Sequence, residues 1–175
     1  MIKNKTQRLT LSGLFVALGI ILPYATAHGM GLAGTLLLPM HIPVLLCGFL
    51  CGPIYGTLCG ALLPLLNCLL TGMPPPFPML PIMFFELCTY GLCSGLLFEK
   101  TRLGKTKCGI YLALPISMIC GRIAYASVFY ILFLVVGDLK ALAVTAAIVT
   151  GLPGILCQFL IIPPIIFLIK EHKRV

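Results

Sequence analysis

The sequence predicts an all-α integral membrane protein, a bundle of six transmembrane helices with the N- and C-termini in the cytoplasm. Of its 175 residues, 60% are hydrophobic and only 9% are charged, and the mean hydropathy is +1.13. A soluble domain carries roughly 25% charged residues to cover its surface, so most of the outer surface of this chain must meet lipid. The third observation is that the basic residues lie in short clusters between long apolar stretches.

Six apolar stretches are the expected transmembrane helices, since about 20 apolar residues cross a bilayer core of about 30 Å. They form a single transmembrane domain, residues 1–175, and their expected limits are 9–26, 36–51, 54–70, 79–98, 108–136 and 141–169. The first stretch lacks a small-residue cleavage site, so we interpret it as a retained helix and not a signal peptide.

Glycine and proline mark the expected breaks between these helices. A Gly-rich loop is expected from Ala27 to Thr35, and Gly52-Pro53 predicts a tight turn. The loop that contains Pro74-Pro75-Pro76 cannot be helical throughout. The sequence from Gly151 to Gly154 interrupts the last stretch, which favours a short re-entrant piece followed by the sixth helix.

The charge pattern sets the expected orientation in a bacterial cytoplasmic membrane. Most of the twelve Lys and Arg residues fall before the first stretch, between the fourth and fifth, and after the sixth. Cytoplasmic loops carry the excess of Lys and Arg, so these three segments belong on one side, which an even number of spans allows. The clusters are Lys3, Lys5 and Arg8; Lys100, Arg102, Lys105 and Lys107; and Lys170, Lys173 and Arg174.

The net charge of +8 is explained by this placement and does not indicate a nucleic-acid partner. The nine cysteines form no C-x-x-C pair, and eight of them lie within apolar stretches, where a thiol acts as a small hydrophobic group. We therefore expect free thiols, no metal site and no cofactor. The eight are Cys47, Cys51, Cys59, Cys68, Cys88, Cys93, Cys120 and Cys157.

Small residues recur at four-residue spacing, which lets helix backbones approach closely. Gly13 and Ala17 form one such pair, and Gly48, Gly52, Gly56 and Gly60 form a longer series that Pro53 interrupts. The pattern fits packing within this bundle, with docking onto a partner membrane protein as the alternative.

Two ionisable residues lie within the expected spans, Glu86 and Arg122, and such residues usually face a cavity or each other. At 1.5 Å per residue, Glu86 lies about 10 Å below the outer end of its helix. Arg122 lies about 22 Å from the inner end of its helix, which leaves about 8 Å to the outer face. The two charges are therefore expected at a similar depth in the outer half of the membrane.

Other polar side chains are expected near the same level, which predicts a binding pocket that opens outward. Each of these residues could instead have a structural role. Glu86 and Arg122 could neutralise each other as an ion pair, and His41 could bond backbone groups that Pro43 leaves free. Asn67 could form a hydrogen bond between helices, and the tyrosines could be packing residues. The additional candidates are Asn67, His41, Tyr90, Tyr125, Gln158 and, in the outer loop, His28.

Several enzyme classes are disfavoured by motifs that the sequence lacks. It has no G-x-x-x-x-G-K-[ST] phosphate loop, no H-E-x-x-H zinc motif and no G-x-S-x-G nucleophile elbow. Its four acidic residues are too scattered for a paired-carboxylate site. We therefore expect no catalytic residues in this chain.

The sequence resembles the substrate-binding S components of energy-coupling factor (ECF) transporters over about residues 8–170. Three stretches carry the resemblance: Leu38-Pro39-Met40-His41-Ile42-Pro43-Val44 followed by Gly52-Pro53-Ile54-Tyr55-Gly56 and Gly60; Phe85-Glu86-Leu87-Cys88-Thr89-Tyr90-Gly91; and Gly13-Leu14-Phe15-Val16-Ala17. In the last stretch many family members have Ala-x-x-x-Ala, and here Gly13 replaces the first alanine.

The resemblance implies a subunit that binds a water-soluble vitamin or related micronutrient from outside, near the outer surface. It also implies partners, namely a transmembrane coupling protein that meets the Gly13 and Ala17 surface and two ATPase subunits that hydrolyse ATP. The alternatives are an ion-coupled secondary transporter of a small polar metabolite, a non-transporting assembly subunit and, least favoured, a membrane enzyme.

Overall fold

The computed structural model describes residues 4–30, 39–104, 106, 109–136 and 142–172, with side chains for 4–25, 39–101, 103–104, 106, 109–136 and 154–169. The described residues form helices joined by turns and contain no strand, which confirms the all-helical class. The helices are α1 (Lys5–Met30), α3 (His41–Cys51), α4 (Pro53–Thr71), α5 (Met79–Lys100), α6 (Gly109–Val136) and α7 (Leu142–His172), with a short 3₁₀ turn η1 (Arg102–Gly104).

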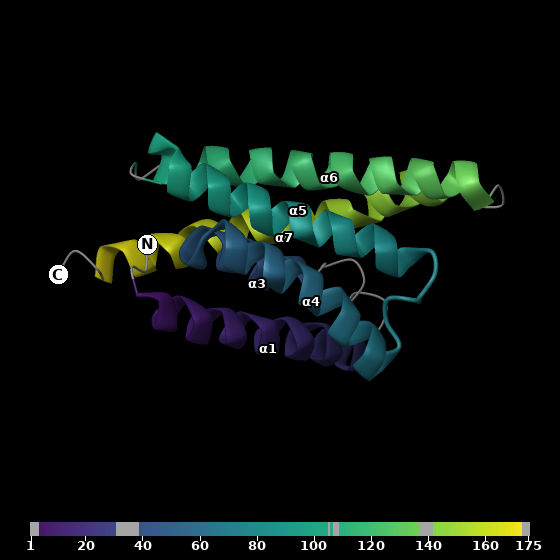
Figure 1. The fold of residues 1–175 in the computed structure, drawn as a ribbon, viewed down its shortest axis with the longest axis horizontal. Helices are drawn as coiled ribbons and strands as arrows, with labels where there is room; N and C mark the ends of the chain where they lie inside the picture. Colours follow the sequence, from purple (N-terminus) through teal and green to yellow (C-terminus); the bar gives the residue numbers. More distant parts are fainter. Residues whose placement is uncertain (1–3, 31–38, 105, 107–108, 137–141, 173–175) are drawn as a thin grey trace.

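The long helices run side by side along one axis (Figure 1). α5 lies near the middle and packs against α3, α4 and α6, while α1 packs against α3 and α4, and α7 against α3 and α6. α1 begins, α5 ends and α7 ends at one end of the bundle, on the left of Figure 1. We call this the Arg8 end.

Among the residues whose side chains are described, four helical segments are long and apolar enough to cross a membrane: Lys5–Ala25, Pro53–Thr71, Met79–Lys100 and Gly109–Val136. Two apolar segments are shorter, namely His41–Cys51 and Gly154–Ile169, which is the part of α7 with described side chains. Large apolar side chains cover the outside of the bundle, among them Leu69, which is 82% exposed, and Leu160, which is 78% exposed. An apolar exterior of this extent belongs in lipid and not in water.

Three expectations about helix limits are wrong in detail. α1 continues as a helix to Met30, so residues 27–30 are not part of a loop, and His28 lies near the end of a helix. α7 is continuous from Leu142 to His172 and includes residues 151–154, so the structure has no re-entrant break there. Helix-breaking residues are tolerated in such helices because neighbouring groups satisfy the backbone that they free. Residues 39 and 40 form a turn and α3 begins at His41, so the second helix is shorter at its start than expected. The expected limits at 36, 108 and 141 fall on residues outside the described part of the chain.

The glycine series packs inside the bundle and not against a partner. A Cβ on Gly48 would overlap Ser94 and the Gly91 carbonyl, and a Cβ on Gly56 or Gly60 would overlap the backbone of α5. α5 contributes Gly91 in return, whose missing side chain makes room for the backbone of α4. Close approach of this kind lets α3, α4 and α5 gain van der Waals contact without large side chains.

The turn between α3 and α4 and the first turn of α1 meet at the Arg8 end. Gly52 has a φ of +95°, which glycine adopts without the strain that a Cβ would add, and Pro53 starts α4. Next to it, Arg8 Nη2 of α1 lies 3.2 Å from Glu99 Oε1 of α5. These contacts hold α1 against the end of α5, far along that helix from Glu86.

Candidate functional site

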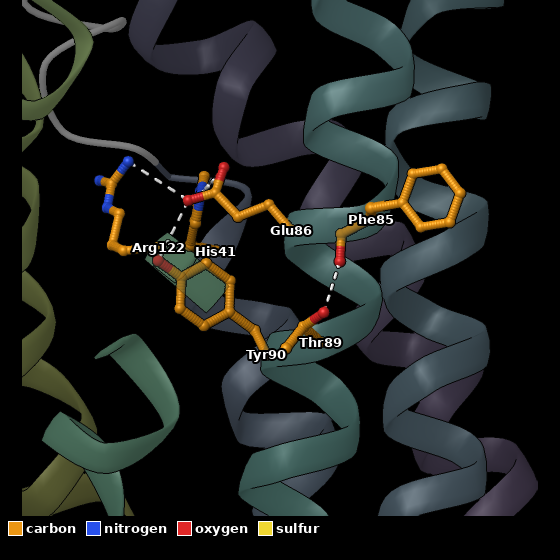
Figure 2. A network of polar contacts seen from close by, with 6 residues as sticks. All are labelled: His41, Phe85, Glu86, Thr89, Tyr90 and Arg122. Carbon is orange, nitrogen blue, oxygen red and sulfur yellow. Dashed lines mark hydrogen bonds and ion pairs between the residues drawn. The ribbon is translucent and has the colours of Figure 1, made fainter. Parts of the chain in front are cut away.

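Glu86 is the centre of a buried polar cluster formed by α3, α5 and α6 (Figure 2). Its Oε1 lies 3.2 Å from Arg122 Nη1 and accepts a hydrogen bond of 3.1 Å from Tyr90 Oη. Its Oε2 lies 3.7 Å from His41 Nε2. The structure therefore brings together four residues that the sequence placed at a similar depth.

Helix geometry explains how these side chains reach one carboxylate. Glu86 and Tyr90 are four residues apart on α5, so both lie on the same face of that helix. His41 is the first residue of α3, and its ring meets the Tyr90 ring edge-on with the centroids 5.3 Å apart. Figure 2 shows Phe85 pointing away from the cluster, so consecutive residues of α5 separate the exposed face from the polar face.

Arg122 comes from the middle of α6 and lies close to a second tyrosine. The Cζ atom of Arg122 is 6.0 Å from the centroid of the Tyr125 ring, at the limit of a cation–π contact. Gly121 was not singled out from the sequence, yet a Cβ there would lie 2.6 Å from Tyr90 Cε1. Glycine at this position therefore lets α6 approach Tyr90, which brings Arg122 within reach of Glu86.

The two charges compensate each other in a largely dry environment. The side chain of Glu86 is 2% exposed and that of Arg122 is 20% exposed. Removing a lone carboxylate from water is costly, and a paired, hydrogen-bonded carboxylate avoids most of that cost. The ion pair explains how a charged residue is retained inside an apolar bundle.

Several polar atoms of this cluster are buried and have no hydrogen-bond partner in the described part of the chain. They are Nδ1 and Nε2 of His41, Nε and Nη2 of Arg122, and Oη of Tyr125. Buried polar groups are normally paired, so a set of unpaired atoms around one ion pair is the arrangement expected where a ligand completes the bonding.

The other candidate residues are placed differently. Asn67 donates from Nδ2 to the Gly19 carbonyl of α1 at 3.2 Å and to the Leu63 carbonyl at 3.0 Å. Its Oδ1 is buried and has no hydrogen-bond partner among the described residues. Gln158 on α7 is 1% exposed, and neither end of its amide is paired within the described residues. The side chain of His28 lies outside what the structure describes.

The described side chains provide no group of three or more His, Cys, Asp or Glu residues arranged to hold a metal ion. The described cysteines lie within the helices and form no disulfide with one another. The charges and hydrogen-bonding groups of the Glu86 cluster are suited to recognising a polar ligand.

The small residues of α1 present a surface to the outside of the bundle. Gly13 and Ala17 are both exposed, and a Cβ on Gly13 would meet no atom within 4 Å. The space beside Gly13 contrasts with the glycine series of α3 and α4, where an added Cβ would overlap neighbouring atoms. Exposed small residues of this kind allow another helix to approach closely.

A buried ion pair with unpaired donors beside it, held by apolar helices, is an arrangement expected in a membrane protein that binds a small polar molecule. The family model for the substrate-specific component of ECF transporters matches residues 7–166. The chain therefore belongs to this family and is a substrate-binding transport subunit. No curated protein and no solved structure matches the chain, so the assignment depends on the family model.

Proposed function

We propose that this chain is the S component of a bacterial ECF importer, which captures a water-soluble vitamin or related micronutrient from outside the cytoplasmic membrane. The observation that carries the proposal is the buried, incompletely bonded cluster around Glu86 in a member of this family. A structural ion pair alone does not account for the unpaired donors beside it.

The proposed topology has six spans with both termini in the cytoplasm. Its support is the Arg8 end of the bundle, where α1 begins, α5 ends and α7 ends (Figure 1). The three basic clusters of the sequence adjoin these three helix ends, and Lys and Arg favour the cytoplasmic side. Glu86 lies seven residues from the other end of α5, about 10 Å along the helix, so the cluster faces the outside in this topology.

In this proposal the cluster binds the substrate. Arg122 holds an anionic or carbonyl group, Glu86 accepts hydrogen bonds, and His41, Tyr90 and Tyr125 provide hydrogen bonds or ring contacts. The remaining candidates are Asn67 and Gln158, each with buried unpaired atoms, and His28 near the end of α1.

The proposed partners are a transmembrane coupling protein and two ATPase subunits, which supply the energy for release of the substrate inside. The exposed Gly13 and Ala17 surface of α1 is the proposed contact with the coupling protein. Its separation from the Glu86 cluster allows substrate and partner to bind at the same time.

The test is a thermal-unfolding screen of the purified full-length protein in detergent against water-soluble vitamins and their precursors. A ligand at 1,000 times its Kd stabilises the folded state by about 4 kcal/mol. For a chain of this size that corresponds to a rise in Tm of about 8–16 °C. We expect one compound or one group of related compounds to give such a rise.

Matched variants then place the site. Glu86→Gln is expected to abolish or strongly reduce the rise in Tm, whereas Glu99→Gln, the same substitution at the Arg8 end, is expected to leave it unchanged. A well-folded protein that responds to no compound contradicts the proposal and favours an assembly subunit. Equal loss of binding in both variants contradicts the assignment of the site.

A further inference from the structure

The guanidinium group of Arg122 is only partly used by the contacts within the cluster. Its Nη1 lies 3.2 Å from Glu86 Oε1, whereas Nε and Nη2 are buried without a hydrogen-bond partner among the described residues. A guanidinium is planar and holds its donors in a fixed fork. Nε and Nη2 point from the same edge of that fork, so the unpaired atoms form one bidentate donor.

The unpaired atoms beside Arg122 also include a hydroxyl. Tyr125 is 4% exposed, its ring lies next to the guanidinium, and its Oη is buried and unpaired in the described structure. In contrast, Glu86 Oε1 already accepts a bond from Tyr90 and faces Arg122 Nη1. The spare bonding capacity around Arg122 therefore consists mainly of donors.

We propose that the substrate of this S component carries a single carboxylate, which binds to Nε and Nη2 of Arg122 with the Tyr125 hydroxyl as a further donor. The inference rests on the proposed function and narrows the class of substrate. A carboxylate is planar and presents two oxygens side by side, which matches the free edge of the guanidinium. Glu86 then holds Nη1 and keeps that edge turned toward the substrate.

The charges of Glu86 and Arg122 favour a substrate with one carboxylate over cationic or doubly charged substrates. A cation would meet the positive charge of Arg122, whose one anionic neighbour among the described residues is Glu86. A phosphate dianion would place two negative charges next to one arginine that is already shared with Glu86, and uncompensated charge is costly where water is largely excluded. A monoanion adds one negative charge, and the neutral remainder of the molecule contacts the tyrosine and histidine rings.

The experiment compares acids with close analogues that lack the charge, using the full-length protein in detergent. The panel contains water-soluble vitamins and precursors, with each acid accompanied by its amide or alcohol, such as nicotinate with nicotinamide and pantothenate with pantothenol. Thiamine serves as a cation, pyridoxine as a neutral compound and inorganic phosphate as a small oxyanion. We expect one acid to raise Tm and its uncharged analogue to bind on the order of 100-fold more weakly.

A matched pair of substitutions tests the role of the fork. Arg122→Lys keeps the charge but removes the bidentate edge, so we expect on the order of 10- to 100-fold weaker binding of the acid. Arg8→Lys makes the same change at the Arg8 end and is expected to leave the affinity unchanged. The comparison of each acid with its analogue uses the unmodified protein, so it remains decisive if Arg122→Lys does not fold.

The outcomes distinguish this inference from the proposed function. Equal binding of an acid and its uncharged analogue, tightest binding of a cation or of phosphate, or full affinity in Arg122→Lys overturns the carboxylate assignment and leaves a substrate-binding subunit. A cooperatively unfolding protein that binds no member of the panel overturns the proposed function itself.

Discussion

Neutralising Glu86 and Arg122, first separately and then together, measures how strongly the empty protein depends on their contact. Arg122→Gln leaves a carboxylate that is 2% exposed without its arginine, whereas Glu86→Gln leaves an arginine that is 20% exposed. The carboxylate is therefore the more fully enclosed of the two groups. We therefore expect Arg122→Gln to be the more damaging change.

The expected sizes follow from the cost of breaking a buried ion pair, about 3–5 kcal/mol. Arg122 is partly exposed, so the pair is not fully buried, and this reduces the expected cost to about 2–3 kcal/mol for Arg122→Gln. Glu86→Gln is expected to cost about 1–2 kcal/mol, because an amide in the same place still accepts the hydrogen bond from Tyr90. In the double variant no buried charge remains, so its cost should fall short of the sum by about 1–2 kcal/mol.

Thermal unfolding of the ligand-free protein in detergent is the assay. Each kcal/mol changes Tm by about 2–4 °C for a chain of this size, so Arg122→Gln should lower Tm by about 4–12 °C. If the cost of the double variant equals the sum of the two single costs within about 0.5 kcal/mol, the two residues are not coupled in the empty protein. A larger loss in Glu86→Gln than in Arg122→Gln would refute the reasoning from burial.

Three further predictions concern the helix contacts. Gly91→Ala should lower the free energy of unfolding by about 1–3 kcal/mol, because the new Cβ overlaps the backbone of α4. Gly13→Ala should be neutral or slightly stabilising, because its Cβ would meet no described atom within 4 Å. Equal effects of the two substitutions in thermal unfolding would contradict this packing. Gly13→Leu combined with Ala17→Leu should reduce co-purification of the coupling protein and ATPases without changing Tm or substrate binding, and unchanged co-purification would remove this surface from the proposed contact. Asn67→Ala should cost about 0.6–1.7 kcal/mol through loss of its bond to the Gly19 carbonyl, and lost substrate binding at unchanged stability would instead assign Asn67 to the binding site.

Glu86 and Arg122, which the sequence predicts at one level of the bundle, lie in contact in the structure. Residue counts along apolar helices place side chains at a level in the membrane, because the rise per residue is constant. The same count placed Tyr90 and His41 nearby, and the structure brings all four into one cluster. The direction in which each side chain points was not determined by that count.

Asn67 illustrates the limit of the depth argument. It lies at a suitable level but donates to the Gly19 carbonyl on α1, and the described structure gives it no contact with Glu86. Depth is a one-dimensional quantity, and the side of the bundle that a residue faces depends on which helices are neighbours. That information comes only from the packing of the helices.

The small residues also show that a sequence pattern does not tell which helix a residue faces. Gly48, Gly56 and Gly13 all belong to four-residue patterns, yet the first two lie against α5 and the third meets no atom. The four-residue spacing indicates that another helix can come close to the backbone, but it does not indicate which helix does so.

The sequence by itself determined the membrane environment, the helical class and the family. These depend on composition, on apolar length and on residues near one another in the chain, all of which are local properties. Only the tertiary structure decided that Glu86 pairs with Arg122, that Gly121 makes room for Tyr90, and that one edge of the guanidinium has no partner among the described residues. Those features depend on the rotation and spacing of helices that are distant in sequence, which close packing sets jointly for the whole bundle.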